Sequence, residues 1–319
     1  METVEVIIIG SGPAGYAAAL YAARAQLKPL VLAGEKGGGQ LMLTTQVENY
    51  PGFKDGVMGP DLMAVMRQQA EKFGAVMKDQ NVDKVDFSRQ PLTVVSGEIE
   101  YQGEAVILTT GAESIPLGVP GESDYIGRGV SYCAVCDAPF FKDKRVVVVG
   151  GGDAAVEDTL ALTKFTAKIS LIHRRDQFRA SKIMQARVLG QKDKVEVLWE
   201  SQVVKVTGDE KHVTSVTVKN IKTGQVQEIP AQGLFVAIGH RPATEFLKGQ
   251  VALDEKDYVK TSINYPEGQS WLKGYPTMTS VPGVFAGGDN VDFRYRQAVT
   301  AAGMGVMAAL DAEKWLEGL

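Results

Sequence analysis

Residues Val4–Gly15 read VEVIIIGSGPAG, an apolar run that ends in a glycine-rich turn. The run Val4–Ile9 is typical of a buried parallel strand. The turn has the pattern G-x-G-x-x-G, and an alanine-rich helix is expected from Ala14 to Ala25. In this pattern the first glycine allows a tight turn, the second lets the backbone approach a pyrophosphate, and the third allows close helix–strand packing. The stretch therefore predicts a strand–turn–helix unit that binds a dinucleotide.

The same pattern returns in the middle of the chain. A second apolar strand is expected over Arg145–Val149, and residues 150–155 then read GGGDAA, a G-x-G-x-x-A pattern. A helix is expected from about Ala154 to Lys164, followed by a strand from Lys168 to Ile172. One such fingerprint can be a glycine-rich turn without a ligand. Two of them, each between a strand and a helix, predict two Rossmann units and two bound dinucleotides.

The residues after the second strand of each unit indicate which dinucleotide is bound. In a site for NAD an acid at this point binds the ribose 2′-hydroxyl. The second unit instead has HRRDQFR at residues 173–179, and its arginines suit a 2′-phosphate: Arg174, Arg175 and Arg179. This run favours NADPH over NADH, with a solvated basic turn as the alternative. In the first unit, Glu35 is the nearest candidate for a ribose contact.

The only two cysteines of the chain, Cys133 and Cys136, are spaced C-x-x-C, and Asp137 follows them directly. This spacing allows a small, readily reduced disulfide in which one thiol has a lowered pKa. A structural zinc is a weaker interpretation, because it needs four ligands and no histidine lies near the pair in sequence. Two cysteines that only pack as small apolar residues would not explain the acid that follows. The motif therefore predicts a redox-active dithiol.

The composition is that of a soluble globular enzyme, with 45% apolar and 23% charged residues. The length of 319 residues allows about two domains. The net charge of −4 and the pI of about 5.6 show no excess of positive charge of the kind that nucleic-acid-binding proteins have. No apolar run approaches the ~20 residues of a membrane span. We expect no signal peptide, because the first strand begins within a few residues, and we expect a cytoplasmic protein.

Further motifs lie along the chain: GGQL at residues 38–41, ENYPG at 48–52, TGA at 110–112, FVAIGH at 235–240, GVFAGGD at 283–289 and YRQA at 295–298. With the two fingerprints and the C-x-x-C-D motif, they cover nearly the whole length. On these motifs the chain resembles the low-molecular-weight thioredoxin reductases of bacteria. The resemblance implies an α/β fold with two Rossmann-like nucleotide-binding domains of three layers (ββα), in which the NADPH domain is inserted into the FAD domain.

The order of the motifs agrees with such an insertion, since flavin motifs lie near both ends of the chain. The expected division is an FAD-binding domain in two segments around an NADPH-binding domain that carries the C-x-x-C motif: residues 1–116 and 244–319 around residues 117–243. Two crossing strands would join the domains near residues 115–120 and 240–244, and both contain proline. The stretch Gln297–Leu316 predicts a helix that packs against the flavin domain.

The resemblance also implies the residues of each site. FAD would bind the first fingerprint and the motifs around the flavin: Gly10, Gly12, Pro13, Ala14, Gly15, Glu35, Gly39, Gln40, Leu41, Asn49, Thr110, Gly111, Ala112, Asp289, Arg296, Gln297 and Ala298. NADPH would bind the second fingerprint, the basic run and a later glycine: Gly150, Gly152, Asp153, Ala154, His173, Arg174, Arg175, Arg179, Ile238 and Gly239.

In the resembled family, NADPH reduces FAD, FAD reduces the disulfide, and the dithiol reduces thioredoxin. The inserted domain would rotate between the half-reactions, because the cysteines cannot easily face the flavin and an external protein at once. Cys136 would meet the flavin, and Cys133 would attack the substrate disulfide. Asp137 would act as general acid and base for the thiols, which requires a pKa raised by partial burial.

A homodimer is also implied, and we expect thioredoxin to dock near Arg128, Phe140 and Phe141. A place in the core is an equally good prediction for either phenylalanine. The chain departs from the family at Val135, where the family commonly has threonine, and at Ala138, which replaces a residue that can adopt positive φ. The segment 262–277 is longer than expected, and we predict a surface loop without an assigned function.

Other functions agree less well with these motifs. One alternative is a related flavin-dependent oxidoreductase that acts on a different small protein or on a small-molecule dithiol. Dithiol oxidases that use oxygen keep the cysteines but do not need the arginine cluster. Ferredoxin–NADP reductases of this fold lack the C-x-x-C motif, and the flavin subunit of peroxide-reducing systems carries an extra N-terminal module. A flavoprotein scaffold without activity would not need two redox centres.

Overall fold

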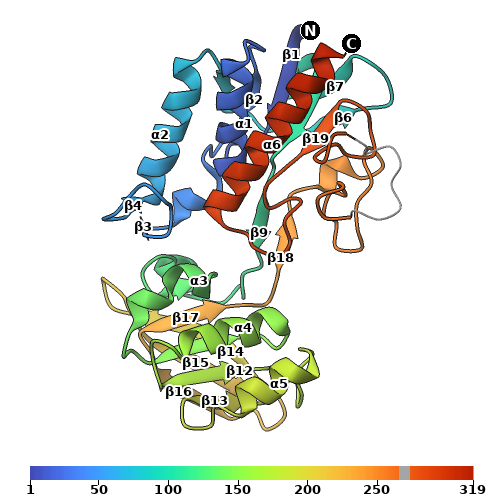
Figure 1. The fold of residues 1–319 in the computed structure, drawn as a ribbon. Coiled ribbons are helices and arrows are strands. Elements are labelled where there is room, and N and C mark those ends of the chain that lie inside the picture. Colours follow the sequence, from blue (N-terminus) through green and yellow to red (C-terminus); the bar gives the residue numbers. More distant parts are fainter. Residues whose placement is uncertain (266–273, 319) are drawn as a thin grey trace. The chain divides into compact units, whose positions relative to one another are not determined.

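The computed structural model describes residues 1–265 and 274–318, and its chain separates into two compact units (Figure 1). The first unit consists of Met1–Glu113 and Arg241–Leu319, and the second of Ser114–His240. The chain thus leaves the first unit, builds the second, and returns. Of the predicted loop 262–277, residues 266–273 lie outside the described residues.

The first unit is built on a mixed sheet with the strand order β5-β2-β1-β8-β7-β6, in which β19 also pairs with β8. The strands are β1 (Glu2–Ile9), β2 (Leu30–Leu32), β5 (Val76–Lys78), β6 (Lys84–Asp86), β7 (Leu92–Ser96), β8 (Ile99–Leu108) and β19 (Val284–Ala286). The pairs of β1, β2, β5, β8 and β19 are parallel, and β6 and β7 are antiparallel to their neighbours. A short antiparallel pair, β3 (Gln46–Val47) and β4 (Val57–Met58), lies outside this sheet. Successive residues of β1 point to opposite faces, and both faces are buried.

One face of this sheet is covered by α1 (Pro13–Arg24) and α6 (Ala298–Glu317), which lie side by side, with α2 (Gly59–Lys72) next to α1 (Figure 1). Small residues allow the two helices to approach closely. A Cβ on Gly305 of α6 would come within 2.0 Å of the Ala14 carbonyl oxygen in α1. The packing therefore requires glycine there, and it fixes the C-terminal helix against the first fingerprint.

The second unit has three layers. Its central parallel sheet has the order β10-β17-β11-β12-β13, and the outer sheet has the antiparallel order β14-β15-β16. The strands are β10 (Val130–Ser131), β11 (Val146–Val149), β12 (Ile169–Ile172), β13 (Val195–Leu198), β14 (Ser201–Gly208), β15 (Val213–Asn220), β16 (Val226–Pro230) and β17 (Gly233–Val236). The helices are α3 (Ala134–Asp137), α4 (Asp153–Leu162) and α5 (Lys182–Leu189).

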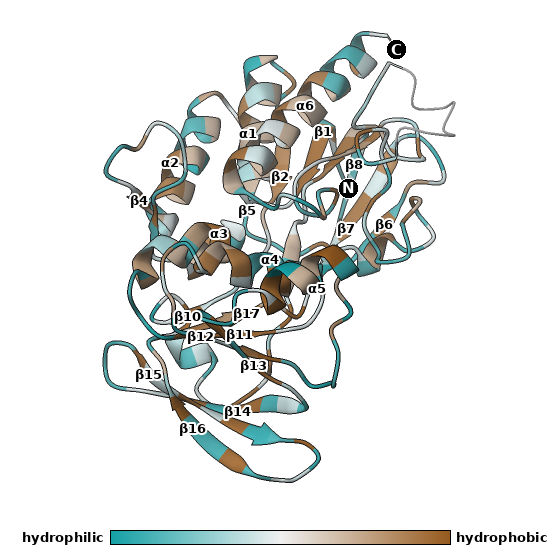
Figure 2. Ribbon diagram, turned by 60° about the horizontal axis from the view of Figure 1, so that its bottom comes forward, coloured by the Kyte–Doolittle hydropathy of each residue, from teal (hydrophilic) through white to brown (hydrophobic). Residues whose placement is uncertain are grey.

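Strand β11 shows why the layers form. Val146 and Val148 are buried with residues of α4 and α5, whereas Val147 and Val149 are buried with residues of β14, β15 and β16. A strand that is apolar on both faces needs a cover on each side. The apolar strands accordingly lie between the helices and the outer sheet (Figure 2). Two Rossmann-like units in an α/β fold were predicted, and this fold class is confirmed.

Short strands mark the two passages between the units. The strands β9 (Ala112–Ser114) and β18 (His240–Pro242) pair with each other, so the outgoing and returning chains run side by side. The amide of Ile115 donates to the Gly239 carbonyl at 3.0 Å, and the amide of Ala243 donates to that of Gly111 at 3.0 Å. In the described part of the chain, no helix has the length and apolarity that crossing a membrane requires.

Candidate active site

The first glycine fingerprint combines two tightly packed positions with one open position. Gly10 has φ +115°, and a Cβ there would lie 2.2 Å from the Thr109 carbonyl oxygen. A Cβ on Gly15 would lie 2.1 Å from the carbonyl oxygen of Gly10. A Cβ on Gly12, in contrast, would meet no atom within 4 Å. The start of α1 is therefore open to a ligand at Gly12, which fits the close approach of a pyrophosphate.

The second fingerprint repeats this division of roles. A Cβ on Gly150 would lie 2.5 Å from the Ala237 carbonyl oxygen, whereas one on Gly152 would meet nothing within 4 Å. A Cβ on Gly151 would come within 2.1 Å of the His173 ring, so this histidine packs directly against the loop. The side chain of Asp153, the first residue of α4, accepts the Ser181 amide at 2.8 Å. This arrangement also fits a pyrophosphate at Gly152.

His173 is buried behind the glycine-rich loop. Its ring packs against Phe178 and Trp199, with centroid distances of 5.5 and 6.2 Å. Its Nε2 lies 3.0 Å from the Gln177 carbonyl oxygen. Burial is the main reason that its pKa lies below the usual value, so the ring is neutral at pH 7. His173 thus shapes the turn that carries the arginines.

The predicted basic run lines a surface hollow of about 310 Å³ in the second unit. Its walls are Arg174, Arg175, Asp176, Gln177, Phe178, Arg179, Glu200, Ile221 and Lys222. The arginines are exposed, as a phosphate-binding cluster requires. Glu200, Ile221 and Lys222 were missed in the sequence, and Lys222 forms an ion pair with Glu200. No local pattern marks these residues, because they reach the hollow from the ends of β14 and β15.

Polar atoms without partners lie among the residues predicted to bind FAD. Among the described residues, the buried side-chain atoms without a hydrogen bond are Thr110 Oγ1, Asp289 Oδ1, Asn290 Oδ1 and Trp315 Nε1. Burial and the nearby Asp292 raise the pKa of Asp289 to about 7, against an opposing effect of Arg296. Buried polar atoms rarely remain unpaired in native proteins. An orphaned hydroxyl and an orphaned carboxyl oxygen fit the hydroxyl- and phosphate-bearing chain of FAD.

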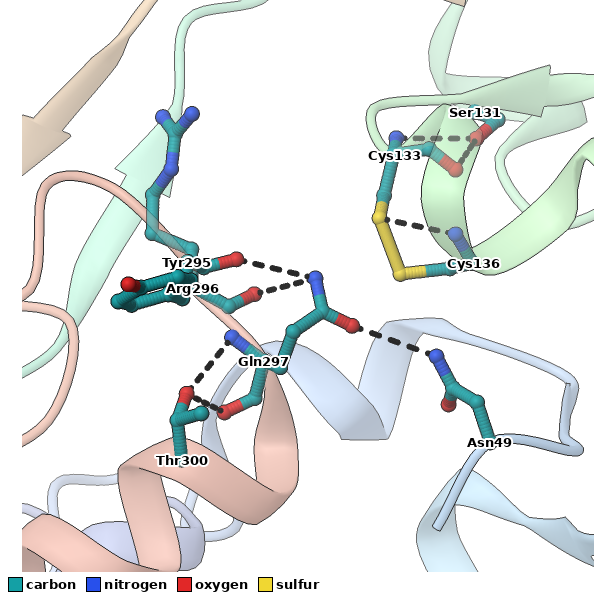
Figure 3. Close-up of a disulfide and its surroundings, with 8 residues drawn as sticks. All are labelled: Asn49, Ser131, Cys133, Cys136, Tyr295, Arg296, Gln297 and Thr300. Atoms are coloured by element: carbon teal, nitrogen blue, oxygen red, sulfur yellow. Dashed lines mark hydrogen bonds between the residues drawn. A yellow bond between two sulfur atoms is a disulfide. The ribbon is translucent and has the colours of Figure 1, made fainter. Parts of the chain in front are cut away.

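The late YRQA motif meets an early loop of the same unit. Asn49 donates its side-chain amide to Gln297 Oε1 at 3.3 Å, and Gln297 donates to the carbonyls of Tyr295 and Arg296 (Figure 3). The hydroxyl of Thr300 completes a capping box with Gln297 at the start of α6. These contacts join residues that are 248 positions apart in sequence.

The other residues predicted for the nucleotides fall on turns and strand ends. Gly39, Gln40 and Leu41 lie in a 3₁₀ turn, where a Cβ on Gly39 would come within 3.2 Å of the Cα of Gly12. The segment 48–54 lines a second hollow of about 450 Å³. Further positions are Pro13 and Ala14 at the start of α1, Thr110 and Gly111 after β8, Ala112 in β9, Ala154 in α4, Ile238 and Gly239 after β17, Ala298 at the start of α6, and the exposed Glu35 after β2.

Cys133 and Cys136 form a disulfide in which the Cα atoms are 5.3 Å apart (Figure 3). The short helix α3 begins directly after Cys133, and the amide of Cys136 donates to Cys133 Sγ at 3.2 Å. Ser131 Oγ accepts the Cys133 amide at 3.1 Å. When the disulfide is reduced, this hydrogen bond to the Cys133 sulfur stabilises a thiolate on Cys133. The geometry thus favours Cys133 as the attacking thiol. In the described part of the chain, no cluster of three or more His, Cys, Asp or Glu side chains forms a metal site.

The pKa of the Asp137 carboxyl is raised, as the predicted acid–base role requires. Burial raises the pKa of its carboxyl, and the Ser131 hydroxyl acts in the opposite direction. Its amide donates to the Cys133 carbonyl at 3.1 Å. The departure at Ala138 leaves the backbone right-handed, with φ −52°, so no positive φ is needed there. Val135, the other departure, is 65% exposed between the cysteines.

A second polar pair near the disulfide was missed in the sequence. Glu122 is only 3% exposed, and its carboxylate accepts the amides of Leu117 and Gly118 and the hydroxyl of Tyr132. Burial raises the pKa of Tyr132, and the bond and charge of Glu122 raise it further. The carboxylate therefore connects the segment after β9 to the residue before Cys133.

Phe141 lies in the core of the second unit, which was the alternative to a docking role. Phe141 is 8% exposed, and its ring packs edge-on against Phe235, with ring centroids 5.0 Å apart. Both rings belong to the core between the central sheet and the helices α4 and α5. Phe140 is half-buried against the same core. Arg128 is exposed, and its guanidinium donates to the carbonyls of Asp124 and Glu210. Arg128 comes before β10 in the chain, whereas the disulfide comes after β10. The 3₁₀ helix η3 (Ala138–Phe141) turns inward, and Gly233 leaves room for the Phe141 ring.

Replacement of Phe141 by alanine is therefore expected to destabilise the protein. Removal of a buried phenylalanine costs about 3–5 kcal/mol, so the melting temperature should fall by several degrees. Reduction of a protein disulfide and of a small disulfide should decline together as the folded fraction falls. Thermal unfolding and both assays test this, with Phe140→Ala as the half-buried comparison. A selective loss of the protein substrate at unchanged stability would restore Phe141 as a docking residue.

A family model for the pyridine nucleotide-disulphide oxidoreductases matches residues 4–305. The chain belongs to this family. A thioredoxin reductase of Mycolicibacterium smegmatis is 51% identical over 98% of this chain and 96% of its own length. That of Streptomyces clavuligerus is 50% identical over 98% and 94%. The structure of thioredoxin reductase from Giardia duodenalis has a TM-score of 0.91 at 43% identity and covers 99% of this chain and 100% of its own. These relatives confirm the resemblance to the low-molecular-weight thioredoxin reductases.

Proposed function

We propose that this chain is an NADPH-dependent thioredoxin-disulfide reductase. The observation that carries the proposal is the Cys133–Cys136 disulfide, which follows β10 in a unit that also holds a nucleotide fingerprint and an arginine-lined hollow. Relatives that are about half identical over nearly the full length are thioredoxin reductases. A chain with one dithiol and two fingerprints has the parts needed to pass electrons from a nucleotide to a protein disulfide.

We assign FAD to residues 1–116 and 244–319, and NADPH to residues 117–243. The open position at Gly12 and the unpaired oxygens of Thr110 and Asp289 support the flavin. The open position at Gly152 and the arginines of the hollow support NADPH. When bound, the flavin accepts two electrons from NADPH and delivers them to a disulfide.

The chain's own residues carry the thiol chemistry. The Cys133 thiolate attacks one sulfur of the thioredoxin disulfide, so a mixed disulfide forms and the thioredoxin bond breaks. The departing thiolate takes a proton from Asp137. The Cys136 thiolate then attacks Cys133 sulfur, which releases the second thioredoxin thiolate and restores the Cys133–Cys136 disulfide. The amide of Cys136, 3.2 Å from Cys133 Sγ, supports Cys133 as the first nucleophile.

Rotation of the second unit would let one disulfide serve both the flavin and thioredoxin. The paired strands β9 and β18 form the two passages of the chain between the units, and they are the natural hinge. The family resemblance also supports a cytoplasmic homodimer. Docking of thioredoxin near Arg128 and Phe140 stays a prediction.

The test is NADPH oxidation by the purified holoenzyme with and without oxidised thioredoxin. We expect rapid oxidation that depends on thioredoxin, and slower reduction of an aromatic disulfide. If the rate of NADPH oxidation does not depend on thioredoxin but depends on a small-molecule dithiol or on oxygen, the alternative is favoured. That alternative is a related oxidoreductase with a different substrate.

A further inference from the structure

The carboxylate of Asp292 holds three consecutive backbone amides of the segment that enters the YRQA motif. Its Oδ1 accepts the amides of Arg294 and Tyr295 at 2.9 and 2.8 Å, and its Oδ2 accepts the amide of Arg296 at 3.0 Å. We propose that Asp292 is a positioning residue that holds Arg296 and Gln297 in the conformation that binds FAD. This inference rests on the proposed function, in which FAD binds the first unit.

The bond to Arg296 is made where the backbone is least favourable. Arg296 has φ +48°, in the left-handed region that residues with a Cβ rarely adopt. Such a conformation persists where the surroundings hold it, and it is frequent at ligand-binding sites. The next residue, Gln297, has extended backbone, and its side chain accepts the Asn49 amide at 3.3 Å (Figure 3). The left-handed turn therefore lies directly before the residue that joins the motif to the Asn49 loop.

Asp292 is itself fixed to the other motifs assigned to FAD. Its backbone amide donates to the Gly288 carbonyl at 2.8 Å. Gly288 has φ +90°, and a Cβ there would lie 2.8 Å from the Cβ of Ala14 at the start of α1. One residue thus connects the turn after β19, which packs on the first fingerprint, to the YRQA motif before α6. A carboxylate with an anchored backbone can hold the segment that follows it.

The charge of Asp292 by itself acts against binding of an anionic cofactor. Burial and this charge raise the pKa of the neighbouring Asp289, which shows that the charge is felt by acidic groups nearby. The pyrophosphate of FAD is negatively charged, and like charges repel. Loss of the charge alone should therefore strengthen FAD binding. Loss of the held conformation should weaken it, because a loose segment must be ordered when the cofactor binds. The sign of the change separates the two effects.

The experiment measures how tightly the holoenzyme retains FAD, so it does not depend on activity. Purified holoenzyme is diluted and filtered, FAD in the filtrate is quantified, and the absorption spectrum of the bound flavin is recorded. For Asp292→Ala we expect FAD binding to weaken about tenfold or more, as for the loss of a hydrogen bond to a charged group. The spectrum of the flavin that stays bound should change, because its surroundings change.

Asp292→Asn is the conservative variant. Its one amide oxygen can keep the bonds to Arg294 and Tyr295, but the bond to Arg296 is lost. We expect a smaller weakening of FAD binding than in Asp292→Ala. Asp209→Ala is the matched control, because Asp209 of the second unit accepts the amides of Lys211 and His212, each at 2.7 Å. It should leave FAD binding and the flavin spectrum unchanged.

Equal or tighter FAD binding in the Asp292 variants would overturn the inference. So would weaker binding with an unchanged flavin spectrum, the pattern expected when the unit is merely less stable. If Asp292→Ala does not fold, Asp292→Asn decides the question, and failure of both variants to fold would show that Asp292 supports the fold instead. A wild-type protein that retains no FAD would contradict the proposed function, which is a different result from variants that retain FAD as the wild type does.

Discussion

Replacement of Cys133 by serine is expected to abolish thioredoxin reduction, with a loss of at least about 10³-fold, as for removal of an enzyme nucleophile. NADPH should still reduce the bound flavin at the wild-type rate, because neither fingerprint is touched. The measurements are steady-state thioredoxin reduction and the loss of flavin absorbance after mixing with NADPH. Loss of both would show that Cys133 supports the fold or the flavin site instead.

The matched variant is Cys136→Ser. It keeps the thiol whose sulfur accepts the Cys136 amide, so it should form a stable mixed disulfide with a thioredoxin that lacks its own second cysteine. The Cys133→Ser variant should form none. The adduct is visible on a non-reducing gel and by mass spectrometry. Equal trapping through Cys136 would reverse the assignment of the two thiols.

Replacement of Arg174, Arg175 and Arg179 by glutamine is expected to raise the KM for NADPH by about 100-fold or more. Each charge-assisted hydrogen bond contributes about 1.5–3 kcal/mol, and 1.4 kcal/mol corresponds to about a factor of ten. The KM for NADH should change little, because NADH has no 2′-phosphate. The measurement is the pair of KM values, together with binding of 2′,5′-ADP to the holoenzyme.

Arg187→Gln provides the control for a lost positive charge. Arg187 is an exposed arginine on α5 that does not line the hollow. Its replacement should leave both KM values near those of the wild type. A wild-type enzyme that prefers NADH, or a triple variant with equal losses for both nucleotides, would contradict the role of the arginines.

The sequence predicted the elements that depend on local patterns. The first helix was expected over Ala14–Ala25 and runs over Pro13–Arg24, and the strand expected over Arg145–Val149 runs over Val146–Val149. Apolar runs and the steric demands of glycine act over a few residues, so they can be recognised without the fold. The C-x-x-C pair was found for the same reason.

Other features depend on residues that only the fold brings together. Phe141 is buried because Gly233, 92 positions later, leaves space for its ring. Ile221 and Lys222 join the arginine hollow from the end of β15. Ser131 and Glu122 carry no motif, and their importance lies in the backbone groups and side chains that they contact. Exposure and long-range hydrogen bonds are set by tertiary packing, which local patterns do not encode.

The central claim is that electrons from NADPH reach thioredoxin through Cys133 and Cys136. The most direct measurement counts both ends of this transfer in one anaerobic reaction: the NADPH oxidised and the thioredoxin thiols formed. We predict that two thioredoxin thiols form for each NADPH oxidised. In the Cys133→Ser variant, we predict that no thioredoxin thiols form. NADPH oxidation without thioredoxin thiols, or full transfer without Cys133, would contradict the account.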